Sequence, residues 1–176
     1  MAEFPFDFDF LKNRYDYELQ RKEQLTTALT LPVAVLTGLG GAIVAMARSF
    51  SYRDAPVTWL FSPVLVADGI AFFVCLVYLA RAYHRQTYMF LPLLCQIDQS
   101  RDEFLEFAHV MAGGVGEVLE EFEKQMRGRM IDAADHNTQT NDERSGLLNP
   151  ARVALYAVLL LTAIAGVPYV VDQVRF

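Results

Sequence analysis

Three long stretches that carry almost no charge constrain the fold of this chain more than any other feature. Residues 25–47 (LTTALTLPVAVLTGLGGAIVAMA) and residues 153–171 contain no charged residue, and residues 57–80 contain one, Asp68, near the middle. A helix of about 20 apolar residues crosses the ~30 Å hydrocarbon core of a bilayer. The three runs therefore predict an all-α membrane protein with three transmembrane helices.

Composition excludes several other classes of protein. Apolar residues make up 53% of the 176 residues, so three buried apolar helices would leave too little amphipathic helix to cover them in a soluble bundle. Fifteen Lys and Arg against 21 Asp and Glu give a net charge of −6, which argues against binding to duplex DNA. Cys75 and Cys95 are the two cysteines, too few for a zinc ribbon or a disulfide framework. We expect no metal and no cofactor.

The distribution of basic residues predicts the orientation and the division of the chain. The segment 1–24 and the segment 81–152 carry more Lys and Arg close to the spans than the first loop and the C-terminal tail do. Because basic residues favour the cytoplasmic side, this bias predicts a cytoplasmic N-terminus and an outside C-terminus in a bacterial inner membrane. We expect an amphipathic segment (1–24), a transmembrane hairpin (25–80), a cytoplasmic helical region (81–152), and a third span with a short tail (153–176).

Helical periodicity predicts two antiparallel helices within the cytoplasmic region. One covers residues 92–111, and a Gly-rich joint at 112–116 separates it from the next, at 117–133. The second places an apolar stripe on a charged helix, with the stripe formed by Leu119, Phe122, Met126 and Met130. The segment FPFDFDF at 4–10 alternates aromatic and acidic residues, which suits a membrane surface or a neighbouring protein.

The polar stretch 135–152 leads directly into the third span. On a helix, Asn137, Asn141 and Arg144 lie on one face, at i, i+4 and i+7. Two amides and a guanidinium are costly to bury without partners. The pattern leaves three interpretations open: a solvated linker, a subunit interface, or a site for an anionic ligand.

Asp68 is the strongest single indication of a functional site. A carboxylate at the centre of a bilayer is costly, and such residues usually face a bundle interior or water. Thr58, Ser62 and Phe72 share its helix face, which suits a wet vestibule that ends at an apolar constriction. We predict that these residues line or gate a pathway; the alternatives are that Asp68 hydrogen-bonds between helices or that the span is shifted.

The first span carries hydroxyl and small side chains at helical spacing. One face holds Thr27, Thr30, Ala34, Thr37 and Gly41, and the adjacent face holds Ala34, Gly38 and Ala42. Small residues let helix backbones approach closely, so Gly38 is a candidate interface residue, and Thr30 and Thr37 join the pathway candidates. Because three spans do not enclose a pore, conduction would require a symmetric homo-oligomer, which we take as a tetramer.

Enzymatic activity is not expected from this sequence. His84, His109 and His136 are scattered, and the chain has no HExxH, Walker or nucleophile-elbow motif. We therefore assign no catalytic residue.

Three segments carry a resemblance to a known family. They are YDYELQRKEQLTTALTLPVAVLTGLGG (15–41), LARAYHRQTYMFLP (79–92) and HNTQTNDERS (136–145). In their order and character they resemble the SLATT-type bacterial membrane proteins, effectors of anti-phage defence in CBASS-like and Hailong systems. The third span of this chain departs from the usual two-span layout of that family.

The resemblance implies a membrane channel that arrests growth. A partner nucleotidyltransferase would make the nucleotide or oligonucleotide that gates it, and cytoplasmic cations would bind its phosphates: Lys12, Arg14, Arg21, Lys22, Arg81 and Arg85. The first hypothesis is thus a homo-oligomeric, cation-preferring channel with Asp68 near the pathway. The alternative is a non-conducting, membrane-anchored adaptor that presents its cytoplasmic helices to a partner. A small transporter is disfavoured because the chain lacks inverted repeats and a second intramembrane charge.

Overall fold

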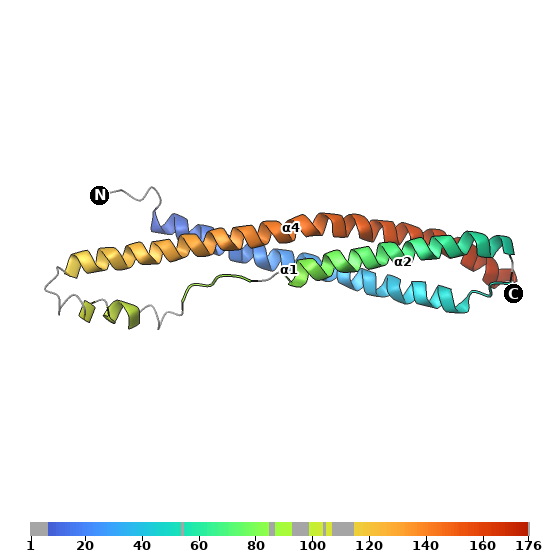
Figure 1. Ribbon diagram of the computed structural model, residues 1–176, viewed down its shortest axis with the longest axis horizontal. Helices are drawn as coiled ribbons and strands as arrows, with labels where there is room; N and C mark the ends of the chain where they lie inside the picture. The colour runs from blue at the N-terminus through green and yellow to red at the C-terminus, as the bar shows by residue number, and fades with distance from the viewer. Residues whose placement is uncertain are drawn as a thin grey trace. The chain divides into compact units, whose positions relative to one another are not determined.

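The computed structural model of the chain is helical and has no strand in its described part, which confirms the all-α prediction. It describes residues 7–53, 55–84, 87–92, 99–103, 105–106 and 115–175. The long helices are α1 (Phe8–Ser49), α2 (Ala55–His84) and α4 (Val115–Arg175), shown in Figure 1. Each has a segment long and apolar enough to cross a membrane, the composition of a membrane protein.

The chain folds as two compact units. The first comprises Met1–Glu23 and Gln86–Asn141, and the second comprises Gln24–Arg85 and Asp142–Phe176. Both α1 and α4 contribute residues to each unit. All three apolar runs of the sequence belong to the second unit.

The second unit is a bundle of three helices around one main apolar core. The core contains Leu36 of α1, Leu79 of α2 and Leu155 of α4. The buried residues of α2 recur at steps of seven, seven, four and three, which keeps one stripe facing the other two helices: Phe61, Asp68, Cys75, Leu79 and Ala82. This stripe therefore packs against side chains of the same chain.

A glycine sets the approach of α1 to α2. A Cβ atom on Gly40 would lie 3.0 Å from the ring carbons Cε2 and Cζ of Phe72, closer than most Cβ contacts in proteins. Phe72, a predicted gate residue, is partly buried against the apolar core at this contact. Its position is explained by packing between α1 and α2.

The loop between α1 and α2 is held by the far end of α4. The Phe50 ring stacks on Phe61, with centroids 4.0 Å apart. The backbone N–H of Ser51 donates to Asp172 Oδ2 at 2.9 Å, and the Ser51 hydroxyl donates to Oδ1 of the same carboxylate. Tyr52 has a φ of 53°, a left-handed conformation that allows the tight reversal.

Two predicted boundaries do not coincide with helix ends. Residues 1–24 and the first span were expected as separate segments, yet α1 continues from Phe8 through the whole span. The boundary at residue 152 likewise falls inside α4. Residues 11–24 and 117–147 are rich in Glu, Gln, Lys, Arg and Leu, which sustain a helix, so charge changes along these helices without ending them.

The predicted helix 92–111 and its glycine joint lie largely outside the described residues. Within them, residues 99–103 and 105–106 are helical. The predicted helix 117–133 is part of α4.

Candidate functional site

The exposed face of α1 differs in chemistry from the exposed faces of its neighbours. It carries many small and hydroxyl-bearing residues, interspersed with the exposed side chains of Leu31 and Val44: Thr27, Thr30, Ala34, Thr37, Gly38, Gly41, Ala42 and Ala45. Added Cβ atoms on Gly38 and Gly41 would meet nothing within 4 Å. The Thr37 hydroxyl donates to the Val33 carbonyl of the same helix at 2.8 Å. The hydroxyl hydrogen therefore already has a partner within α1.

The exposed faces of α2 and α4 are formed by large apolar and aromatic side chains. On α2, Trp59 is 82% exposed and Phe73 is 64% exposed, and on α4 Leu160 and Val167 are 62% and 65% exposed. Such faces match lipid tails, whereas the face of α1 places small residues and hydroxyl groups between its exposed Leu31 and Val44. Both sequence-predicted faces of the first span therefore lie on this small-residue surface.

Asp68 lies inside the bundle of its own chain. The Thr162 hydroxyl of α4 donates to Asp68 Oδ2 at 2.8 Å, and Asp68 is completely buried. Its Oδ1 atom has no hydrogen-bond partner among the described residues. This is the interhelical arrangement that the sequence left as an alternative to a position on the pathway.

The other residues on this face of α2 also turn inward. Thr58 and Ser62 are partly buried, and the Thr58 Oγ1 atom is buried without a hydrogen-bond partner in the described part of the chain. The stripe that the sequence predicted to be wet thus packs toward α1 and α4 of the same copy. It contributes polar groups to the bundle interior instead of to an outer surface.

In the first unit, Asn137 of α4 binds the extended segment 87–92 through its main chain. The Met89 N–H donates to Asn137 Oδ1 at 2.9 Å, and Asn137 Nδ2 donates to the Met89 carbonyl at 3.0 Å. His136 Nε2 lies 2.9 Å from the Thr87 carbonyl, and the Leu91 N–H donates to the Tyr15 hydroxyl at 3.2 Å. Side chains thus hold this segment by its backbone.

Asn141 joins this segment to a buried carboxylate on α1. The Tyr88 hydroxyl donates to Asn141 Oδ1 at 2.7 Å, and Asn141 Nδ2 lies 2.9 Å from both the carbonyl and Oε2 of Glu18. Glu18 is completely buried. Arg14 Nη2 lies 3.0 Å from Glu18 Oε1, and Arg21 Nη1 lies 3.6 Å from Oε2. The two guanidinium groups offset the cost of burying this charge.

Arg144, in the second unit, binds the end of α2. Its Nε donates to the Ala82 carbonyl at 3.2 Å, and its Nη2 donates to Thr26 Oγ1 at 3.4 Å. Satisfying a C-terminal helix carbonyl with a cation is favourable because that end of a helix carries partial negative charge. Arg144 is 1% exposed.

The polar face of α4 is therefore an internal contact surface within one chain. Asn137, Asn141 and Arg144 are each fully or almost fully buried, so the interpretation of residues 135–152 as a solvated linker is wrong. Their partners lie in the same chain, and no second subunit is needed to satisfy them.

Three of the predicted phosphate-binding cations contact other side chains of the first unit. Arg14 and Arg21 pair with Glu18, and the Lys22 ammonium lies over the rings of Tyr88 and Phe90, at 4.8 and 4.9 Å from the centroids. The remaining three were predicted from charge alone: Lys12 and Arg81 are exposed, and Arg85 lies outside the described residues.

Sequence reasoning missed Glu18 and Tyr88 as members of this polar network. One signal was available for Glu18, because Arg14 and Arg21 stand four residues before it and three after it on the same helix. Nothing in the spacing of Tyr88 points to Asn141.

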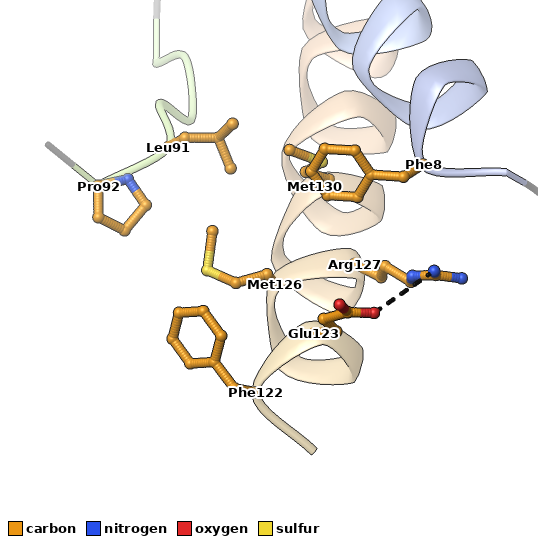
Figure 2. Close-up of a pocket in the computed structure, with 8 residues that line it drawn as sticks. All are labelled: Phe8, Leu91, Pro92, Phe122, Glu123, Met126, Arg127 and Met130. Atoms are coloured by element: carbon orange, nitrogen blue, oxygen red, sulfur yellow. Dashed lines mark ion pairs between the residues drawn. The ribbon is translucent and has the colours of Figure 1, made fainter. Parts of the chain in front are cut away.

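The first unit also contains an apolar cavity of about 570 Å³. The apolar side chains that form most of its walls are Phe8, Leu91, Pro92, Phe122, Met126 and Met130. Glu123 and Arg127 also line the cavity and form an ion pair at 3.8 Å. Figure 2 shows Phe122 and Met126 of α4 turned toward Leu91 and Pro92. Three of the four residues of the predicted apolar stripe on residues 117–133 face this cavity.

Comparisons of the chain with protein-family models, with curated proteins and with solved structures gave no match. Among the described residues, no three His, Cys, Asp or Glu side chains are grouped closely enough to hold a metal ion.

Proposed function

We propose that the protein is a homo-oligomeric membrane ion channel in which α1 of each copy faces a shared axis. The observation that carries this proposal is the exposed face of α1 in the second unit. Thr30, Ala34, Thr37, Gly38 and Gly41 are all exposed there, beside Leu31 and Val44, whereas large apolar and aromatic residues predominate on the exposed faces of α2 and α4.

Physical reasoning favours contacts between copies at this face. Helices in lipid associate by close backbone packing at small residues, because lipid tails solvate large apolar side chains as well as a neighbouring helix does. A ring of copies that meet through α1 would bring the Thr30 and Thr37 hydroxyls toward the axis. Because three spans do not enclose a pore, ions would pass between copies.

This arrangement gives Asp68 a different role from the one that the sequence suggested. Asp68 binds Thr162 and joins α2 to α4 behind the face of α1. It therefore stabilises the wall of the pathway and does not contact the ions that pass along it.

We also propose that the first unit lies in the cytoplasm and regulates the opening of the channel. Arg144 fixes the last turns of α2, and Asn137 and Asn141 hold the segment that follows α2. A ligand that changes this packing could change how the spans pack. The resemblance to SLATT proteins supports the further proposal of a growth-arrest effector of anti-phage defence, gated by a nucleotide or oligonucleotide from a partner enzyme.

Ion flux through liposomes that contain the purified protein tests the proposal. Changing Thr30 and Thr37 together to valine keeps their shape and removes two hydroxyl groups. If each hydroxyl contributes about 1 kcal/mol to ions or water in the pathway, the loss of both lowers the flux about 30-fold. We expect Asp68→Asn, which keeps a hydrogen-bond partner for Thr162, to leave the flux near the wild-type value.

The opposite pattern would contradict the α1-lined channel. A loss of flux in Asp68→Asn with no effect of the two valines would place Asp68 on the pathway. Ion-tight liposomes together with retained growth arrest in cells would favour the membrane-anchored adaptor.

A further inference from the structure

The face of α1 that we place at the axis carries one charge. Between Gln24 and Ser49 the helix contains a single charged residue, Arg48, and no carboxylate. Arg48 follows Thr30 by 18 residues and Thr37 by 11, which is about five and about three turns at 3.6 residues per turn. The three side chains therefore share one side of α1, and all three are exposed.

We propose that Arg48 determines the charge selectivity of the pathway and makes it favour anions. This inference rests on the proposed function, because it requires that copies of α1 surround an axis. In a symmetric ring, each copy would contribute one guanidinium group at the same level. Rings of Arg or Lys attract anions and repel cations in pores.

Among the described residues at this end of the bundle, no exposed carboxylate offsets Arg48. Asp172 of α4 is 2% exposed and is bound by Ser51. Arg53 in the connecting loop is exposed and adds positive charge. The sequence-based prediction of cation preference depended on Asp68, which is completely buried inside each bundle.

The reversal potential across a KCl gradient measures this selectivity in planar bilayers. For the wild-type oligomer we expect a Cl⁻/K⁺ permeability ratio above one. Arg48→Glu should bring that ratio below one, and Arg48→Gln should give an intermediate value. The matched control is Arg152→Glu, because Arg152 is exposed on the outer face of α4 and should leave the ratio unchanged.

The possible outcomes separate this inference from the proposed function. A conducting wild type whose permeability ratio does not change in Arg48→Glu overturns the role of Arg48 and leaves the channel standing. A wild type that conducts no ions removes the proposed function and this inference with it.

A second readout does not depend on an open pathway. In a chain with Cys75→Ala and Cys95→Ala, Arg48→Cys should be cross-linked between copies by a short bis-maleimide, and Arg152→Cys should not. No cross-link at position 48 in an intact oligomer would overturn the inference.

Discussion

Replacing Gly38 with leucine is expected to dissociate the oligomer and abolish ion flux. Gly38 lies on the exposed face of α1, and a Cβ there would meet no atom of its own chain within 4 Å. A leucine therefore fits the single copy but keeps two α1 backbones apart. Because small residues allow the close packing that holds helices together in lipid, the bulkier side chain removes most of that contact. Size-exclusion chromatography in detergent, with the mass corrected for bound detergent, measures the result.

Gly69→Leu is the matched control for this substitution. Gly69 is an exposed glycine within the apolar run of α2, and it too would meet nothing within 4 Å. We expect Gly69→Leu to assemble and conduct like the wild type, since α2 faces lipid. Loss of the oligomer in Gly69→Leu with assembly retained in Gly38→Leu would place the interface on α2.

Replacing Asn141 with leucine is expected to destabilise the first unit by about 2–4 kcal/mol, because it leaves buried polar groups without partners. Asn141 accepts from the Tyr88 hydroxyl and donates to the carbonyl and the carboxylate of Glu18. Leucine is of similar size and offers none of these bonds. Amide hydrogen exchange should show faster exchange at Met89, whose N–H is held by Asn137 in the same segment.

Asn149→Leu supplies the control for the loss of an asparagine from α4. Asn149 is exposed on the same helix, so its replacement should change stability by less than about 0.5 kcal/mol. Equal effects of the two substitutions would show that the contacts of Asn141 contribute little to the fold.

The helices themselves could be predicted from the sequence, and their environment could not. Length and absence of charge identified all three apolar runs, because crossing a bilayer demands both. The position of Asp68 depended on which face of α2 packs inward, and that is set by partners such as Thr162, 94 residues away. The helical repeat determines which residues share a face of the helix. It does not determine whether that face contacts another helix, lipid or water.

The polar face of α4 is a second case in which the sequence predicts a shared helix face but not its contacts. The spacing of Asn137, Asn141 and Arg144 placed them together correctly, and the cost of burying them indicated specific partners. Those partners are main-chain groups of Met89 and Ala82 and the carboxylate of Glu18. Main-chain carbonyls carry no sequence signal, so the sequence could not distinguish contacts within the chain from a subunit interface or a ligand site.

Cysteine cross-linking in native membranes tests most directly whether α1 faces itself across the oligomer. Single cysteines at Ala34 of α1, Ala67 of α2 and Ala163 of α4, all of them exposed, would be introduced after Cys75 and Cys95 are changed to alanine. The account predicts that Ala34→Cys forms cross-linked dimers, the largest species a single thiol per chain can give, while Ala67→Cys and Ala163→Cys remain monomeric. Cross-linking at position 67 or 163 without cross-linking at position 34 would contradict it.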